Sequence, residues 1–168
     1  MRGTKFRRDP LLSEENWKAF EYEVKMFCGA RKLMRRDNLG QIAKNAALES
    51  ALLHTRILVE ALLSRGKKGS DITLADLLPI GKQPPGLCSA IARLDRCYGH
   101  NTRGMLCWTL NKRLAHLTKE RGDSYDYWLL FEKIDPLVQE VLRIAIPLLQ
   151  RPELERLVAN RGPCIKGC

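Results

Sequence analysis

The chain has 168 residues, of which 45% are hydrophobic and 29% charged, so it can bury a core without disulfide or metal staples. This composition excludes a mainly disordered chain and a fibrous one. The formal net charge of +10 favours anionic partners, such as RNA or another polyanion.

The first helix is predicted to begin after Ser13, a favourable N-cap residue. Apolar side chains then recur at steps of three and four residues and define one buried face. They are Trp17, Phe20, Val24, Phe27 and Ala30. A basic run comes next, which suits a solvent-exposed helix C-terminus and consists of Arg31, Lys32, Arg35 and Arg36.

The second helix is predicted from Asn38 to Ser64, and it carries two apolar stripes on different sides. One stripe comprises Leu39, Ile42, Ala46, Leu53, Ile57 and Ala61. The other comprises Leu48, Leu52, Val59 and Leu63. A helix that is apolar around most of its circumference is expected at the centre of a bundle.

Glycines and prolines between residues 65 and 86 predict a long connection, with a short helical turn near Leu74 to Leu78. A third helix is expected over Leu87 to Cys97 and a fourth over Arg103 to Arg121, with a leucine stripe at Leu106, Leu110, Leu114 and Leu117.

A fifth helix is predicted to begin near Ser124. Asp135-Pro136 marks either a kink in it or a fresh start capped by Asp135, and Pro147 and Pro152 bend or divide the chain beyond it.

The whole pattern predicts an all-α bundle of four to five main helices, with the long loop between the second and the third. We expect a basic N-terminal arm over residues 1–12, one helical domain over 13–160, and a flexible tail over 161–168 that contains Cys164 and Cys168. No signal-peptide core follows the basic start, and charges interrupt the most apolar stretch, residues 46–63. These features predict a cytoplasmic protein without a membrane partner.

Six cysteines are present, and free thiols are the expectation for a chain without a secretory signal. Cys28 and Cys107 fall in apolar helical patterns and are expected to pack as small hydrophobic residues. Cys97 and His100 are three residues apart, but no second close pair of ligands completes a zinc pattern. We therefore predict neither a metal nor a cofactor.

Glu49, Arg56 and Glu60 form a polar strip on the second helix, within about 40° of one another at 3.6 residues per turn. Three interpretations stay open: a buried ion-pair network, a polar cleft lined by the three groups, and ordinary exposure. A buried network predicts that Arg56→Ala costs about 3–5 kcal/mol. His54 lies off this strip and is expected to be a satisfied core or boundary residue.

The fourth helix carries the second candidate site, around His116. Lys112 and Arg113 precede the imidazole and Glu120 follows it, each within one helical turn. Such an imidazole beside fixed positive charge can act on a phosphodiester, whereas a solvated basic helix flank is the simpler interpretation. Lys112, Arg113, Lys119 and Arg121 are the predicted polyanion contacts.

The pattern from Glu49 through Leu53, His54 and Arg56 to Glu60, followed by Leu-Asn-Lys-Arg-Leu-Ala-His-Leu-Thr at 110–118, resembles a family of small bacterial helical proteins that is itself similar to HEPN domains. HEPN domains are helical bundles that often dimerise and include ribonucleases of toxin and defence systems. HEPN nucleases carry Arg, four to six further residues, and then His. The matching positions before His116 hold Asn111, Leu110 and Thr109, so the arginine is absent there.

The resemblance therefore implies the fold more than it implies catalysis. We expect a self-associating bundle that binds RNA or another polyanion through its basic surface, and not an enzyme. Two alternatives remain. One is a metal-independent ribonuclease with His116 as the catalytic acid or base, and the other is a non-catalytic bundle that binds a protein partner. A homodimer is expected because the fourth helix has apolar or bulky residues on two faces, with Trp108 and Ala115 roughly opposite the leucines.

Overall fold

The computed structural model describes residues 14–63, 72–78, 84–99, 105–115 and 126–159, and every regular element in these ranges is a helix. The helices are α1 (Glu14–Met34), α2 (Gln41–Leu62), α3 (Leu74–Leu77), α4 (Pro85–Tyr98), α5 (Leu106–Ala115), α6 (Tyr127–Leu148) and α7 (Pro152–Ala159). The prediction of an all-α helical bundle is confirmed. The short turn predicted after the second helix is α3.

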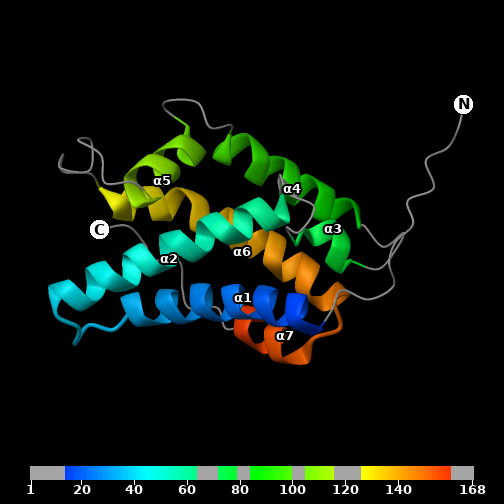
Figure 1. Cartoon of the computed structure of the whole chain (residues 1–168), viewed down its shortest axis with the longest axis horizontal. Helices are drawn as coiled ribbons and strands as arrows, with labels where there is room; N and C mark the ends of the chain where they lie inside the picture. Colours follow the sequence, from blue (N-terminus) through cyan, green and yellow to red (C-terminus); the bar gives the residue numbers. More distant parts are fainter. Residues whose placement is uncertain (1–13, 64–71, 79–83, 100–104, 116–125, 160–168) are drawn as a thin grey trace, which may run out of the picture.

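Two long helices, α2 and α6, form the centre of the bundle. Figure 1 shows α1 and α2 side by side and running in opposite directions, as a helical hairpin. α6 packs against α2, α4 and α7, and α5 packs against α2 and α4. α7 closes the end of the bundle at the start of α1, where the Arg151 guanidinium lies 4.6 Å from the centre of the Trp17 ring.

The apolar face predicted for the first helix is the buried face of α1. Phe20, Val24, Phe27 and Ala30 are buried, and Trp17 packs against the core as a half-buried side chain. The three- and four-residue spacing places these side chains on one side of the helix, and α2 covers that side. The predicted cap, Ser13, lies outside the described residues.

Only one of the two stripes predicted for the second helix faces the core. Leu52 and Val59 are buried, and Leu48 and Leu63 pack against the core. The other stripe is not buried: Ile42, Leu53 and Ile57 are 88%, 44% and 39% exposed. α2 is central, as predicted, but α1, α5 and α6 cover its remaining faces and leave this stripe open.

The ends of α4 follow local chain chemistry. Pro85 is the first helical residue, so α4 starts two residues before the predicted Leu87. The helix ends at Gly99, whose φ of +67° lies in the left-handed region, and whose N–H donates to the Asp95 carbonyl at 2.9 Å. A Cβ on Gly99 would lie 2.8 Å from Cε of Met105.

α6 is one helix and not two. It begins after Asp126, whose Oδ1 accepts a hydrogen bond from the Leu129 N–H at 3.0 Å. It then runs through Asp135-Pro136 and past Pro147, so a fresh start capped by Asp135 is wrong. Tertiary packing of α6 against α2, α4 and α7 can offset the backbone hydrogen bond that Pro136 removes. Pro152 divides α6 from α7, as predicted, and is the first residue of α7.

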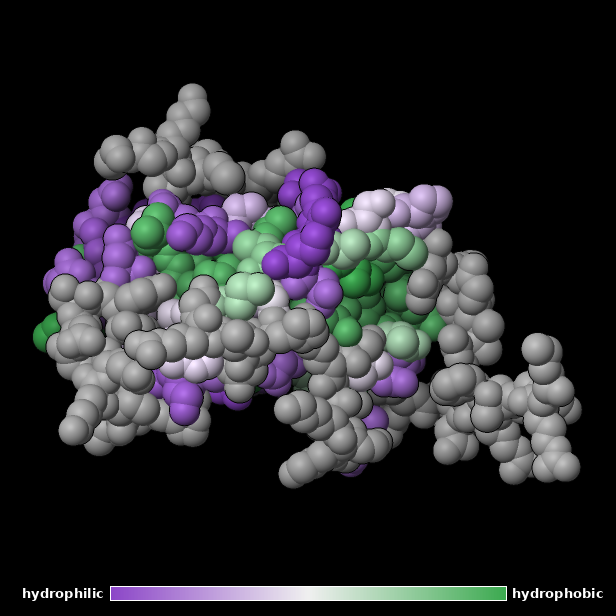
Figure 2. Space-filling view, turned by 90° about the horizontal axis from the view of Figure 1, so that it is seen from above, coloured by the Kyte–Doolittle hydropathy of each residue, from purple (hydrophilic) through white to green (hydrophobic). Residues whose placement is uncertain are grey.

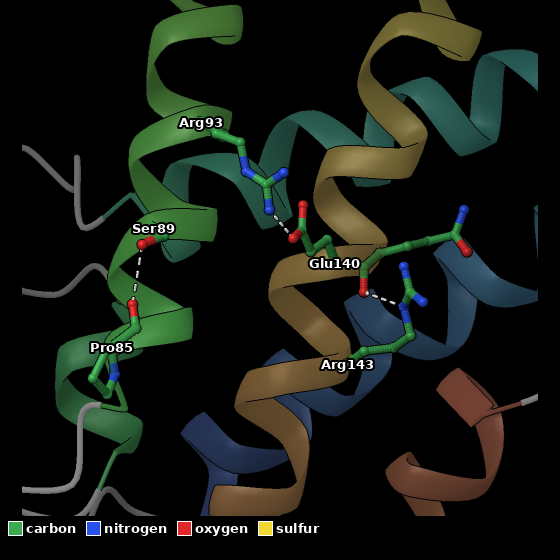
Figure 3. A network of polar contacts seen from close by, with 6 residues as sticks. Pro85, Ser89, Arg93, Glu140 and Arg143 are labelled. Atoms are coloured by element: carbon green, nitrogen blue, oxygen red, sulfur yellow. Dashed lines mark hydrogen bonds and ion pairs between the residues drawn. The ribbon is translucent and has the colours of Figure 1, made fainter.

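Figure 3 shows how α4 and α6 are joined at the surface. The Arg93 guanidinium on α4 forms an ion pair with the Glu140 carboxylate on α6. Within α6, Nε of Arg143 donates to the backbone carbonyl of Gln139 at 3.3 Å, and within α4 the Ser89 hydroxyl donates to the Pro85 carbonyl at 3.2 Å. These contacts have a structural role: the ion pair joins α4 to α6, and the two hydrogen bonds each join successive turns of one helix.

Candidate functional site

The predicted polyanion site lies mostly outside the described residues. His116, Lys119 and Arg121 fall there, as does the side chain of Arg113. Lys112 is half-buried on α5. The catalytic role of His116 and the phosphate contacts therefore stay predictions.

α5 leads into the His116 segment from a polar junction with α2 and α4. Tyr98, at the end of α4, is fully buried, and its hydroxyl interacts with the neighbouring Cys107 on α5. One turn further along α5, Nδ2 of Asn111 lies 3.6 Å from the Cys107 sulfur. Burial raises the pKa of the Tyr98 hydroxyl far above its ordinary value, Cys107 and Glu60 raise it further, and Arg56 opposes them. The hydroxyl therefore stays protonated and can act only as a neutral donor or acceptor.

The polar strip predicted on the second helix is a surface feature. Nε of Arg56 lies 3.4 Å from Oε1 of Glu60, and the two side chains are 28% and 46% exposed. Glu49 is exposed as well. A fully buried network does not fit this exposure, although Arg56 and Glu60 are part-buried and their charges act on the pKa of the buried Tyr98 hydroxyl. The strip consists of one partly exposed ion pair at i and i+4 together with the exposed Glu49.

We expect Arg56→Ala to lower the free energy of unfolding by no more than about 0.5 kcal/mol, because exposed helical ion pairs at this spacing contribute little. Urea denaturation of the wild type and the variant measures the change. A loss as large as about 3 kcal/mol would show that the arginine is a buried hub after all.

His54 is the satisfied core residue that the sequence indicates. It is 6% exposed, and its Nδ1 lies 2.7 Å from Oε2 of Glu23 on α1. The Tyr22 ring meets the imidazole edge-on at a centroid distance of 5.9 Å. Sequence reasoning missed the carboxylate because Glu23 belongs to the neighbouring helix.

The sequence did not indicate that Arg31 and Asp135 form an ion pair between helices. Nε of Arg31 on α1 lies 2.6 Å from Oδ1 of Asp135 on α6, and the side chains are only 11% and 13% exposed. Gln139 donates its side-chain amide to the other oxygen of Asp135. Burial raises the pKa of Asp135, and Arg31, Gln139 and Arg35 oppose the rise. One feature of the sequence could have indicated this pair: Asp135 is a carboxylate within the apolar sequence of α6, and a buried carboxylate needs a partner.

Cys28 lies beside this pair and packs against the core, as predicted. Burial raises the pKa of its thiol, Arg31 opposes the rise, and Asp135 adds to it. Cys107 is buried, also as predicted, and none of the four described cysteines, Cys28, Cys88, Cys97 and Cys107, forms a disulfide. The raised pKa of Cys28 makes its thiol a poor nucleophile, which fits packing and not catalysis.

Two absences concern the described part of the chain only. Its His, Cys, Asp and Glu side chains form no cluster of three that could hold a metal ion. None of its helices combines the length and the apolar character needed to cross a bilayer. His100, the neighbour of Cys97 in the incomplete zinc pattern, lies outside these residues.

The positive charge of the chain is distributed unevenly. The described residues contain 16 Lys and Arg and 15 Asp and Glu, so the helical body is close to neutral. The remaining residues contain 13 Lys and Arg and only 4 Asp and Glu. Residues 1–13 alone hold four cations, Arg2, Lys5, Arg7 and Arg8, against one acid, Asp9. The excess positive charge that would attract a polyanion therefore lies mainly outside the described residues.

Comparison with known proteins gives no assignment. No family model, no curated protein and no solved structure matches the chain.

Proposed function

We propose that this protein binds RNA, or a polyanion of similar charge density, through basic segments attached to a nearly neutral helical bundle. The distribution of charge carries the proposal: an excess of nine positive charges lies outside the described residues and an excess of one within them. Lys and Arg on such segments neutralise phosphates and release counterions, which gives affinity without base readout. Aromatic residues are only 7% of the chain, which also favours electrostatic contact over base stacking.

We also propose that the bundle is HEPN-like, that it self-associates, and that it works in the cytoplasm. The all-α architecture and the resemblance of residues 45–121 support the first point. The His116 segment, with Lys112, Arg113, Lys119 and Arg121, is a further contact surface in this proposal. The ribonuclease and protein-partner alternatives are outcomes of the experiment below.

The test compares two variants that lose the same number of positive charges. One carries Arg2→Gln, Lys5→Gln, Arg7→Gln and Arg8→Gln. The matched control carries Lys18→Gln, Lys32→Gln, Arg36→Gln and Arg156→Gln, at four exposed positions on α1, its C-terminal extension and α7. Fluorescence anisotropy of a labelled single-stranded RNA, measured over a range of KCl concentrations, gives the affinity and its salt dependence.

We expect the first variant to bind RNA more weakly and with a shallower salt dependence. Its slope of log K against log salt should fall by up to about 3, since each phosphate contact on a single strand contributes about 0.7. The control should stay close to the wild type. An equal loss in both variants, or wild-type binding that salt does not change, contradicts the proposal and favours a protein partner.

His116→Ala forms a second arm of the same experiment. We expect weaker RNA binding with an unchanged melting temperature if the predicted solvated position of His116 is right, because substitution at such a position normally shifts stability by no more than about 0.5 kcal/mol. The same RNA, run on a denaturing gel with and without chelator, reports cleavage. Cleavage that His116→Ala abolishes and a chelator does not would establish the ribonuclease alternative.

A further inference from the structure

One face of α2 combines exposed apolar side chains with charges, and we call it the outer face of α2. It consists of Ile42, Ala46, Glu49, Leu53, Arg56, Ile57 and Glu60. At about 100° per residue, these seven positions lie within about 60° on either side of Leu53. Ile42, Leu53 and Ile57 are three of the six large hydrophobic side chains that are exposed in the described residues. The other three, Tyr22, Met105 and Leu129, lie on separate elements.

Elsewhere, apolar surface also shows between hydrophilic side chains, as Figure 2 shows for the side of α4 and α5. The outer face of α2 differs because its apolar residues form a row along one helix. The remaining faces of α2 are covered by α1, α5 and α6, so no described helix covers this row. Exposed apolar side chains that share one helix face with charged residues are typical of an interaction site.

We propose that a second copy of this chain packs on the outer face of α2, with the two α2 helices antiparallel around a twofold axis beside Leu53. The charges of the face argue for this occupant. Glu49 lies four residues before Leu53 and Arg56 three residues after it, at about 6 Å and about 4.5 Å along the helix. In an antiparallel pair, Glu49 of each copy therefore meets Arg56 of the other, and the contact occurs twice.

The apolar residues match under the same symmetry. The two Leu53 side chains meet at the axis. Ile57, about 6 Å from the axis on the other edge of the face, comes against the Ser50 and Ala46 side of the second copy, where the side chains are small. A surface that is complementary to itself in both shape and charge is what a twofold interface requires.

The same face is poorly suited to RNA. It carries two carboxylates, Glu49 and Glu60, against one guanidinium, and phosphates are repelled by such a balance. The proposal is therefore independent of RNA binding, and either one can fail while the other holds. It also places self-association on α2, whereas the sequence pointed to the fourth helix.

The test uses two charge variants and their mixture, measured by sedimentation equilibrium. In a homodimer of the Glu49→Arg variant, arginines at positions 49 and 56 face each other across the interface. In a homodimer of the Arg56→Glu variant, two glutamates face each other at the same positions. Because like charges repel across an interface, each should raise the dimer Kd by about tenfold or more. A mixture of the two variants restores opposite charges at both contacts and should dimerise nearly as tightly as the wild type. Glu153→Arg and Arg156→Glu, at exposed positions on α7, are the matched controls and should dimerise like the wild type.

Leu53→Asp tests the apolar centre of the interface, and Leu129→Asp is its control at an equally exposed leucine on α6. We expect the first to be a monomer and the second a dimer, with circular dichroism reporting that both are folded. The proposal is overturned by a wild type that stays monomeric at all concentrations, by a Leu53→Asp variant that stays dimeric, or by a mixture of charge variants that does not recover. The charge variants decide the matter even if Leu53→Asp does not fold.

Discussion

Replacing Arg31 by alanine is expected to lower the free energy of unfolding by about 3–5 kcal/mol at neutral pH, because the substitution leaves the Asp135 carboxylate buried without its counter-charge. The guanidinium also lies 5.5 Å from the centre of the Phe27 ring, and this contact is lost as well. Urea denaturation at pH 7 measures the change. The matched control is Arg93→Ala, which removes the exposed ion pair with Glu140 and should cost less than about 1 kcal/mol.

The same variant has a predictable pH dependence. Burial raises the pKa of Asp135 above its ordinary value in the folded state, so protonated Asp135 favours folding, and this contribution is lost as the pH rises through the raised pKa. Arg31 opposes the rise, so its removal raises the pKa of Asp135 further. The destabilisation by Arg31→Ala should therefore be small below the ordinary aspartate pKa of about 3.8 and grow as the pH rises to neutrality.

Replacing both charged residues distinguishes the cost of leaving one charge buried alone from the contribution of the ion pair itself. Arg31→Met combined with Asp135→Leu removes the pair without leaving a lone charge, so the double variant should be far more stable than Arg31→Ala and close to the wild type. An Arg31→Ala variant that is as stable as Arg93→Ala, or equally destabilised at pH 3 and pH 7, would falsify the buried pair.

Phe27→Ala is expected to cost about 3–5 kcal/mol, because the ring is fully buried at the contact between α1 and α2 and its removal leaves a cavity. Tyr22→Ala, on the same helix, is the matched control, since the Tyr22 side chain is 54% exposed and its loss should cost less than about 1 kcal/mol. Phe27→Leu should fall between the two, because it keeps most of the apolar volume. Thermal and urea denaturation measure all three, and equal costs for Phe27→Ala and Tyr22→Ala would contradict the assigned core.

The order of the main helices could be predicted from the sequence, because local signals specify it. Their number could not, since the pattern predicts four to five main helices and the described residues form seven, counting the short α3 and α7. Three- and four-residue spacing placed Phe20, Val24 and Phe27 on one buried face, and this holds whatever covers that face. Pro152 at a helix start and the glycine at 99 after a helix end are equally local, since each depends on the backbone of its own residue. The sequence also predicted that His54 lies in or beside the core with a polar partner, but it could not identify that partner as Glu23.

The tertiary structure alone decided which faces are buried and which charges meet. α2 carries two apolar stripes of similar strength, and periodicity cannot tell which of them a neighbour will cover; packing against α1 and α6 buried the stripe of Leu52 and Val59 and left Ile42, Leu53 and Ile57 exposed. The pairing of Arg31 with Asp135 depends on α1 meeting α6, helices that are far apart in the sequence. Local propensity and periodicity act within a few turns of chain, whereas burial and ion pairing depend on which helix comes to lie alongside, and that is a property of the assembled bundle.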